Sequence, residues 1–457
     1  MLGVGQVKPR LTGVTLLCAD TTHKAHLAAR AIAKSMEQAD FEQVKLLTNN
    51  SQLPHAVKIP EIKGLEAYSK FCIRDMHKYV DTPHALIVQF DGYALNGEAW
   101  TDEFLKFDYG GAPFQPSNTI GNGGFGIRSK RIMEACSKLP TGSDHPEDAA
   151  ISIRFRSELE AQGLKFMPVE LARKLSFEGR SWDSKEWRGV QNKWAGSFGF
   201  HSFLSAGIPD PPVIAVHAGD AGDIIYSMPV LKALGGGMLF LTPDNKFPYP
   251  LDTRWTRTGG DAEFVDNLAP LLEAQPYVWS CKYTHGHPAS CTHDLNRFRL
   301  PWRNRTAKDF QSILSLHCEA FNVPIPTEPW LTVPDPICVP GRPIVVSRTA
   351  RYHNDKFDWY KLVQKWHSKM VFVGTEQEAS VFQGLSCPHK VPHFKTSNAM
   401  ELAQVIAGSE MFIGNQSLAL AIAHGLFKKV VIEEWPLNPN TRMDRPGVYL
   451  GVPENWL

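Results

Sequence analysis

The chain has 457 residues, more than a single hydrophobic core usually serves, so we expect two or three domains. Hydrophobic residues make up 43% and charged residues 21%, as in ordinary globular proteins, and 48 basic against 47 acidic residues leave a net charge of +1. This balance excludes a general electrostatic attraction to nucleic acid or to membrane surfaces, although it leaves room for a local basic patch.

Cysteine usage and the N-terminus bear on the compartment. Eight cysteines are spread along the chain without the density of a disulfide scaffold, which is typical of a reducing cytosol. The opening segment MLGVGQVKPRLTG lacks the apolar core of a signal peptide, and no apolar run approaches the length of a membrane span. We therefore expect a soluble cytoplasmic protein.

The first third of the chain alternates between apolar runs and segments with helical spacing. Strands are predicted at 13–22, 41–50 and 84–90, and helices at 23–39 and 66–80. Such alternation indicates an α/β fold with a mostly parallel sheet covered on both faces. Ligands bind such sheets beyond the carboxyl ends of the strands, where Asp20, Thr21 and Asp91 are expected to lie.

A proline-rich stretch at 205–216 predicts a linker, after which the alternation starts afresh. The segment 213–243 has the pattern of a strand, a helix and a second strand. Residues of roughly 245–340 are harder to interpret, and the alternation is clear again from Pro343. The middle and final parts therefore resemble two Rossmann-like halves of one larger unit. The expected domains are residues 1–205, a linker at 206–212, and halves at 213–340 and 341–457.

Four segments of the first third together indicate a transfer site. They are QFDG with Asp91, GNGGFGIRSKR from Gly121, HPED with Glu147 and Asp148, and FGFHS with His201. A carboxylate at a strand end and a distant imidazole can hold a hard divalent cation against a diphosphate. The glycines let backbone approach a ligand, and a second carboxylate pair can take a proton from an acceptor hydroxyl. Taken singly, each segment also fits a cap, a turn or a structural histidine.

As an ordered set, these segments resemble the nucleotide-sugar glycosyltransferases of the GT-A type, and more narrowly a family of uncharacterised GT-A-like domains. The family pattern includes the pieces YS, LIVQ-D-G, DY-GAP, GNGGF, PED and FGFH, and the resemblance covers roughly residues 12–203. The matching residues are Tyr68, Ser69, Gln89, Asp91, Trp100, Asp108, Tyr109, 111–113, 121–125, Glu147, Asp148 and 198–201.

This resemblance implies roles for individual residues. Asp91 would be the last acid of a D-x-D motif and His201 the C-terminal ligand of a Mn²⁺ or Mg²⁺ ion. Glu147 or Asp148 would be the base that deprotonates the acceptor if the sugar inverts, and their role in a retaining reaction is open. The residues expected to contact the nucleotide-sugar donor are Asp20, Thr21, Gln89, Asn122, Gly123 and Gly124. Because Gln89 replaces the first acid of D-x-D, the resemblance leaves open whether a cation is held.

The stretch VHAGDAGDIIYSMPVLKAL follows a predicted strand and opens a helix, where backbone N–H groups can bind an anion. Through Gly222, Asp223, Pro229 and Leu234 it resembles the start of GT-B transferases of the heptosyltransferase type, which are family 9-like. The resemblance covers roughly residues 212–450 and implies Asp223 as a base that works without a metal. A helix cap is the alternative role for Asp223, and a degenerate unit that serves acceptor binding or assembly is the alternative for the whole segment.

The final half supplies further candidate donor contacts. Asn415, Gln416 and Ser417 match the nucleotide-sugar end of the same GT-B group, with Gln416 in place of the usual Asp. Ser417 is expected to cap the following helix and to meet the donor phosphates. After the strand at 343–348, the cations Arg348, Arg351 and Lys356 can face a diphosphate or belong to a solvated loop.

Five potential zinc ligands lie close together at 281–293. They are Cys281, His285, His287, Cys291 and His293. The spacing matches no known zinc module, so a histidine-rich surface loop is the preferred interpretation.

The sequence therefore predicts a tandem glycosyltransferase that moves a sugar from a nucleoside-diphosphate donor to a hydroxyl acceptor, with two candidate active sites. One rival is a non-catalytic nucleotide- or carbohydrate-binding scaffold, favoured by Gln89 and Gln416. The other is a viral-type transferase that acts on modified bases in DNA. The basic–aromatic strips KEWRGVQNKW and RFRLPWRNR would then form a DNA-binding cleft, for which the net charge gives no support.

Overall fold

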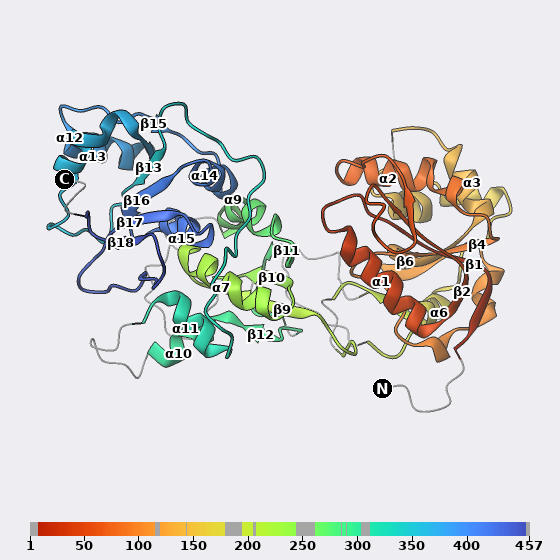
Figure 1. The fold of residues 1–457 in the computed structure, drawn as a ribbon. Helices are drawn as coiled ribbons and strands as arrows, with labels where there is room; N and C mark the ends of the chain where they lie inside the picture. The colour runs from red at the N-terminus through yellow and green to blue at the C-terminus, as the bar shows by residue number, and fades with distance from the viewer. Residues whose placement is uncertain are drawn as a thin grey trace. The chain divides into compact units, whose positions relative to one another are not determined.

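The computed structural model describes residues 8–114, 119–142, 144–178, 194–203, 207–243, 261–284, 286–288, 290–302 and 311–453. The chain divides into two compact units, a first unit (residues 1–211 and 288–290) and a second unit (212–287 and 291–457). Both are built from sheets flanked by helices (Figure 1). Across the described residues, no helix combines the length and the apolar composition needed to cross a bilayer.

The first unit contains a six-stranded sheet and a separate two-stranded one. The strands are β1 (Arg10–Ala19), β2 (Asp40–Thr48), β3 (Ala56–Lys58), β4 (His84–Val88), β5 (Tyr109–Phe114), β6 (Thr119–Ser129), β7 (Ser176–Glu178) and β8 (Gly199–His201). The large sheet has the order β3-β2-β1-β4-β6-β5. Its first four strands are parallel, whereas β6 runs antiparallel to both β4 and β5.

This antiparallel edge is a feature that the sequence pattern did not predict. Only residues 115–118 separate β5 from β6, and a connection that short joins antiparallel strands, not parallel ones. The GNGG segment, whose glycines were expected to let backbone approach a ligand, is part of strand β6.

Helices surround the large sheet. They are α1 (Ala25–Gln38), α2 (Leu65–Arg74), α3 (Lys130–Ser137), α4 (Glu147–Ala149), α5 (Arg156–Ala161) and α6 (Val169–Leu175). The buried residues of α1 include Ala28, Ala31, Ile32 and Ser35, whose three- and four-residue spacing places them on one face.

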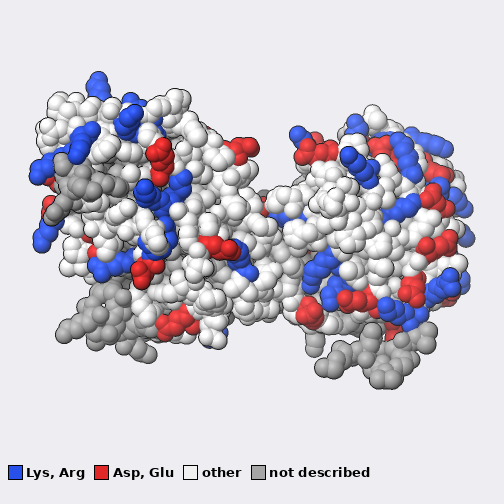
Figure 2. Space-filling model, in the orientation of Figure 1, with Lys and Arg blue, Asp and Glu red and all other residues white. Residues whose placement is uncertain are grey.

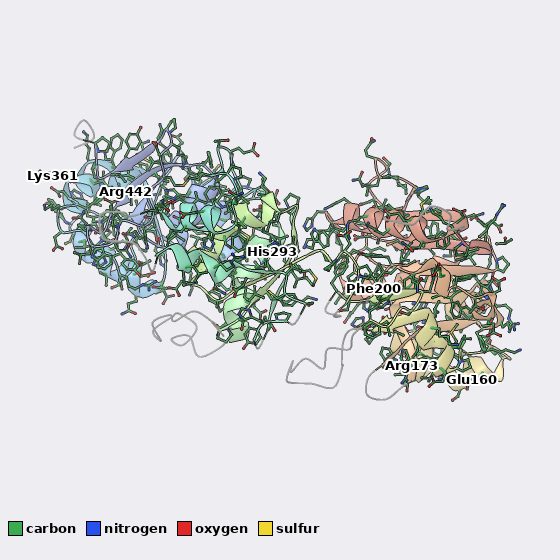
Figure 3. All side chains as sticks on the ribbon, turned by 90° about the horizontal axis from the view of Figure 1, so that it is seen from below. Glu160, Arg173, Phe200, His293, Lys361 and Arg442 are labelled. Carbon is green, nitrogen blue, oxygen red and sulfur yellow. The ribbon has the colours of Figure 1, made fainter. Side chains whose placement is uncertain are left out.

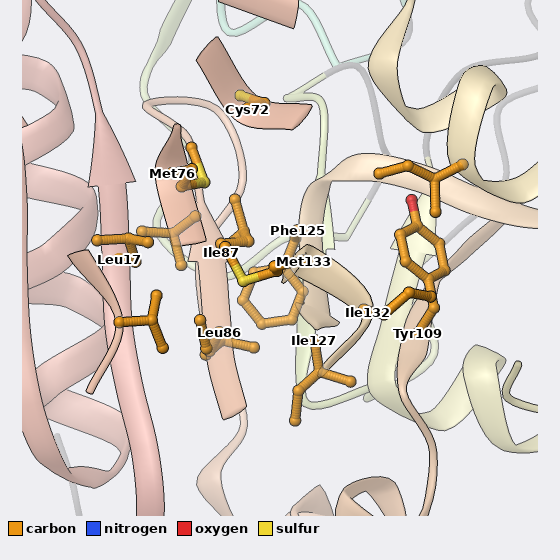
Figure 4. Packing of buried hydrophobic residues seen from close by; sticks show 14 of the residues in the cluster. Leu17, Cys72, Met76, Leu86, Ile87, Tyr109, Phe125, Ile127, Ile132 and Met133 are labelled. Atoms are coloured by element: carbon orange, nitrogen blue, oxygen red, sulfur yellow. The ribbon is translucent and has the colours of Figure 1, made fainter. Parts of the chain in front are cut away.

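The core of the first unit is formed by the central strands and the helices that pack on them. Figure 4 shows Leu17 of β1, Leu86 and Ile87 of β4, and Phe125 of β6 packed together with Met133 of α3. All of these side chains are at most 3% exposed. Strands covered on both faces need such continuous apolar runs, which explains why β1 and β4 were recognisable from the sequence.

The second unit contains two parallel sheets. The strands are β9 (Val213–His217), β10 (Gly237–Leu241), β11 (Val278–Tyr283) and β12 (His293–Asp294) in one sheet, and β13 (Ile344–Ser347), β14 (Met370–Val373), β15 (His393–Phe394), β16 (Met411–Asn415), β17 (Lys429–Glu433) and β18 (Val448–Leu450) in the other. The helices are α7 (Ala221–Ala233), α9 (Asp261–Glu273), α10 (Arg299–Trp302), α11 (Ile313–Ala320), α12 (Trp359–Trp366), α13 (Glu376–Ser386), α14 (Ala399–Ala407) and α15 (Leu418–Gly425).

Strand order identifies the type of each half. The smaller sheet has the order β11-β10-β9-β12, and the larger one β15-β14-β13-β16-β17-β18. Numbered within its own half, the second order is 3-2-1-4-5-6, the doubly wound arrangement of Rossmann folds. One hydrophobic cluster includes Ala215 and Leu239 of the first sheet together with Val345 and Ile432 of the second, so the halves share a core. The expected α/β class and the two Rossmann-like halves are confirmed.

Candidate functional site

The first unit has a topological switch point at β1, because the chain continues from β1 to β2 and β3 on one side and then crosses to β4 on the other. In open α/β sheets the crevice outside the carboxyl ends of such strands is the usual ligand site. β1 ends at Ala19, directly before Asp20, and β4 ends at Val88, directly before Gln89. The predicted residues at both strand ends therefore lie at the same edge of the sheet.

Backbone pairing brings His201 to Asp91 across a long stretch of sequence. The segment after β4 pairs with the β8 region, since Leu95 N donates to Phe198 O at 2.9 Å and Ser202 N to Asp91 O at 2.8 Å. Phe200, labelled in Figure 3, anchors β8 against Tyr93, with ring centroids 4.9 Å apart.

The side chains of Asp91, His201 and Glu178 form a row. His201 Nδ1 lies 2.7 Å from Glu178 Oε2, and because a carboxylate accepts, the Nδ1–H donates. The other ring nitrogen, Nε2, then faces Asp91 Oδ1 at 3.6 Å, which is too long for a hydrogen bond. Glu178 is only 3% exposed and also accepts a hydrogen bond from the Asn122 amide.

This row fits a divalent cation in two respects. Asp91 Oδ1 is buried and accepts no hydrogen bond from any described residue. A histidine whose second nitrogen donates to a carboxylate is the usual form of a metal-binding histidine. The described part of the chain contains no group of three or more His, Cys, Asp or Glu side chains able to hold an ion. Asp91 and His201 alone would leave most of the ligands of a bound ion to water or to phosphate oxygens.

The glycines of β6 make room for protein side chains. A Cβ on Gly124 would lie 2.3 Å from His201 Nε2, and a Cβ on Gly123 would lie 2.8 Å from Glu147 Oε1. Gly124 therefore contacts the ring of His201, whereas Gly123 contacts Glu147 and lies beside Asp148. Asn122 accepts a hydrogen bond from Gly124 N at 2.9 Å, which helps to fix this part of the strand.

The two acids of the HPED segment have different surroundings. Glu147 is 8% exposed and lies beside Arg128, with Oε1 3.6 Å from Nη2, while its Oε2 accepts from Ser69 Oγ at 3.4 Å. Asp148 is more exposed and accepts from Gly123 N at 3.4 Å. Burial and the nearby charge of Glu147 raise the pKa of Asp148.

The segment after β1 borders an open pocket of about 330 Å³, which Thr21, His23, His26, Asn49, Asn50 and Glu61 help to line. Asp20 Oδ1 accepts from Thr22 N at 2.8 Å, and burial raises the pKa of Asp20. The Thr21 hydroxyl accepts from Ile62 N at 2.8 Å, so it ties a neighbouring loop to the strand end. Gln89 donates to the Tyr68 hydroxyl at 3.1 Å.

In the second unit, Asp223 lies in the first turn of α7, after β9. Its Oδ2 accepts from Arg299 Nη2 at 3.3 Å, and Arg299 Nη1 donates to Asn296 Oδ1 at 3.1 Å. Arg299 and Asn296 are 4% and 0% exposed, so the predicted base is held by a buried arginine. The helix-cap position belongs to Asp220, whose side chain makes no capping hydrogen bond.

In the final half, most of the residues that were predicted to contact the donor form hydrogen bonds with other parts of the protein. The Arg348 guanidinium forms two hydrogen bonds with Glu433, at 2.8 and 2.9 Å. Buried Asn415 accepts from Thr349 N at 3.0 Å. Ser417 caps α15, as expected, by accepting from Leu420 N.

Gln416 and Lys356 differ in their surroundings. The Gln416 amide donates to Asn438 O at 2.9 Å and accepts from Trp435 N at 3.0 Å, so it fixes the segment after β17. Lys356 is exposed on the loop after β13.

The N-termini of α7 and α15 lie beside each other. A Cβ on Gly222 would come 3.7 Å from Ser417 O and 3.9 Å from Leu418 N. Helix N-termini favour anions, and two of them meet here between the halves. Arg351 Nη2 lies 3.4 Å from Asp220 Oδ2 at the same junction.

The cysteine and histidine cluster forms no zinc site among its described members. His285 lies outside the described residues. His293, labelled in Figure 3, has its Nδ1 2.8 Å from Thr292 Oγ1, and His287 Nδ1 lies 3.7 Å from Asp294 Oδ2.

Charge on the surface is mixed. On the face drawn in Figure 2, Lys and Arg alternate with Asp and Glu over the described parts of both units. Most of the predicted basic–aromatic strip at 185–194, and residues 303–305 of the second strip, lie outside the described residues.

The sequence patterns did not select Glu178 or Arg128, which the fold brings to this site. Glu178 ends the short strand β7, and Arg128 lies in the segment GNGGFGIRSKR. Their partners lie 23 and 19 positions away, beyond the reach of any local periodicity.

Comparisons with known proteins give a family match within the first unit and remote likenesses to solved structures over 52–60% of the chain. A family model described as "Protein of unknown function (DUF5672)" matches residues 54–201. No curated protein matches the chain.

Three solved structures illustrate the fold matches. The glycosyl transferase family 9 protein of Veillonella parvula is 10% identical, with a TM-score of 0.31, over 52% of this chain and 85% of that one. The E. coli heptosyltransferase WaaC with ADP is 12% identical, with a TM-score of 0.31, over 53% and 94%. The heptosyltransferase TibC in complex with ADP-D-beta-D-heptose is 14% identical, with a TM-score of 0.35, over 60% and 68%. A likeness this remote concerns the fold alone.

Proposed function

We propose that this chain is a glycosyltransferase that moves a sugar from a nucleoside-diphosphate donor to a hydroxyl acceptor, with the reaction in the first unit. The observation that carries the proposal is the row formed by Asp91, His201 and Glu178 at the switch point of the sheet. Its buried Asp91 oxygen has no hydrogen-bond donor among the described residues, which is costly unless a ligand completes it.

Asp91 and His201 would hold a Mn²⁺ or Mg²⁺ ion, which when bound would offset the charge of the departing diphosphate. Glu178 would keep the Nδ1 proton of His201 in place, so that Nε2 would be the ring nitrogen that binds the ion beside Asp91. Gln89, in place of a second acid, contributes no charge and bonds to Tyr68 instead.

The remaining residues of the first unit would orient the substrates. The open pocket beyond β1, next to Asp20, is suited to the polar groups of a nucleotide. Asp148 is the better candidate for the acceptor base, because Glu147 already interacts with Arg128 and Ser69. Its raised pKa makes it a stronger base once ionised.

The second unit would bind a nucleotide-sugar or the acceptor where α7 and α15 meet. Two helix N-termini and Arg351 favour a phosphate at that junction. The pairing of Asp223 with Arg299 weakens its candidacy as a base, since a nearby cation stabilises the ionised carboxylate.

The test is a panel of UDP-, GDP-, ADP- and CMP-linked sugars incubated with the full chain, with Mn²⁺, with Mg²⁺ and with EDTA. We expect release of the nucleotide from at least one donor in the presence of a metal and loss of this activity in EDTA. Calorimetry measures binding of the same nucleotide-sugars. Binding without turnover under any condition would favour the non-catalytic scaffold, an alternative that Gln89 and Gln416 support because both are hydrogen-bonded within the protein.

A further inference from the structure

Arg128 of β6 is a buried charge with few partners. The residue is 2% exposed, and neither Nη1 nor Nη2 has a hydrogen-bond partner among the described residues. Burying a guanidinium without hydrogen bonds is expensive, so its presence inside the first unit calls for a compensating interaction.

The compensating group is Glu147. Its Oε1 lies 3.6 Å from Arg128 Nη2, and its side chain is 11% exposed against 3% for the arginine. The guanidinium also lies over the ring of Tyr109, with 5.7 Å between Cζ and the ring centroid. Figure 4 shows Tyr109 in the packed interior of the unit.

The glycine at position 123 is what allows this pair to form. A Cβ there would lie 2.8 Å from Glu147 Oε1 and 2.9 Å from Arg128 Nη2, so any larger residue would displace one of them. The same Gly123 donates its backbone N–H to Asp148 Oδ2 at 3.4 Å. The ion pair and Asp148 are thus assembled around one glycine of β6.

Ser69 holds the other side of Glu147. Its hydroxyl lies 3.4 Å from Glu147 Oε2 and 2.9 Å from His145 Nδ1. Glu147 is therefore fixed by contacts from β6 and α2, whereas Asp148 points to a more exposed position.

We propose that Arg128 is a positioning residue that holds Glu147 as a fixed anion, so that the adjacent Asp148 receives the acceptor proton. This inference rests on the proposed function. For a transfer with inversion, the acceptor oxygen bonds to the anomeric carbon and its proton goes to the Asp148 carboxylate. The bond from the anomeric carbon to the diphosphate oxygen breaks, and its electron pair leaves with the diphosphate.

Electrostatics agree with this division of roles. Burial and the charge of Glu147 raise the pKa of Asp148, and Arg128 lowers it by a smaller amount. Removing both charges of the pair should therefore lower the pKa of Asp148, and an activity that needs ionised Asp148 would extend to lower pH.

The first part of the test is a stability cycle with Arg128→Met, Glu147→Gln and the double variant. Each single variant leaves one buried polar partner uncompensated, so we expect losses in Tm of roughly 10 °C for the singles and a smaller loss for the double variant. Arg131→Met, at an exposed arginine three positions away, is the control and should leave Tm almost unchanged. If the loss in Tm of the double variant equals the sum of the two single losses, Arg128 and Glu147 do not interact and the proposal is overturned.

The second part is the pH dependence of kcat/KM for donor hydrolysis by the wild type and the folded double variant. We expect the acidic limb of the double variant to lie at lower pH, and that of Arg131→Met to coincide with the wild type. If the wild type is active and the acidic limb of the pH profile lies at the same pH in the double variant, the positioning role of Arg128 is overturned and the proposed function is not. A wild type without any turnover would overturn the proposed function and the positioning role together.

Discussion

The two units differ in how they use polar residues at the ends of their strands. In the first unit, Asp91 Oδ1 accepts no hydrogen bond from a described residue and faces His201 at 3.6 Å. In the second unit, Arg348 binds Glu433 through two hydrogen bonds, and Asp223 accepts one from Arg299. Strand ends therefore hold a carboxylate oxygen that accepts no hydrogen bond from a described residue in the first unit, and hydrogen-bonded ion pairs in the second.

This contrast teaches that a polar residue at a strand end is a site only when the protein leaves it incomplete. A buried ion pair with good geometry supports the fold and has little interaction left for a ligand. A buried oxygen without a donor costs free energy that a bound ligand can restore. We therefore expect a mutation of Asp91 to reduce activity, and a mutation of Arg348 to reduce the free energy of unfolding.

The largest expected effect is on the stability of the second unit. Replacing Arg348 with Met leaves Glu433, which is 0% exposed, without its cation, and should lower the free energy of unfolding by about 3–5 kcal/mol. Urea denaturation of the full chain measures this. Arg351→Met is the matched control, because Arg351 is 43% exposed and should lose less than about 1 kcal/mol. Equal losses in the two variants would contradict the structural role of Arg348.

Replacing Asp91 with Asn should reduce metal-dependent donor hydrolysis by about 100-fold or more, because a cation loses a charged ligand. The free energy of unfolding should change by no more than about 0.5 kcal/mol, since no hydrogen bond to Oδ1 from a described residue is lost. Initial rates at saturating Mn²⁺ and urea denaturation measure the two quantities. Asp223→Asn should keep most of the activity, and the opposite ranking of these variants would move the reaction to the second unit.

The effect of Glu178→Gln should be intermediate. The substitution removes the charge that orients His201, and loss of such a partner typically weakens metal binding by about 10–100-fold. Titration of activity with Mn²⁺, together with calorimetry, gives the affinity. Glu170→Gln on α6, where the side chain is 86% exposed, should leave the affinity as it is. An unchanged affinity in Glu178→Gln would mean that His201 does not bind the ion.

The smallest expected effect is the pH dependence of the second unit. Burial lowers the pKa of His217, His317 and His424, the last to about 3. Below a pH of about 6.5 the unfolded chain binds protons that the folded unit does not, so stability is present above that value and is lost as pH falls. Urea denaturation should show a loss of about 1 kcal/mol or less per histidine between pH 7 and 6. A rise in stability over that interval would contradict the burial of neutral imidazoles.

Local sequence alone determined much of the secondary structure of this protein. The strand predicted at 84–90, the helix predicted at 23–39 and the strand, helix and strand predicted at 213–243 all occur, because each apolar run or helical face has to be buried against the rest of its unit. The antiparallel β5–β6 edge was missed, since a glycine-rich strand lacks the apolar run that marks its neighbours.

Only the tertiary structure decided which polar residues are partners. Arg348 and Glu433 are 85 positions apart, and His201 and Glu178 are 23 apart, so no local pattern links them. Whether a charged side chain holds another part of the protein or stays available for a ligand depends on what the fold brings within hydrogen-bond distance. The sequence could therefore place Asp91 and Arg348 at strand ends, and only the fold distinguishes the carboxylate oxygen without a donor from the arginine that is already paired.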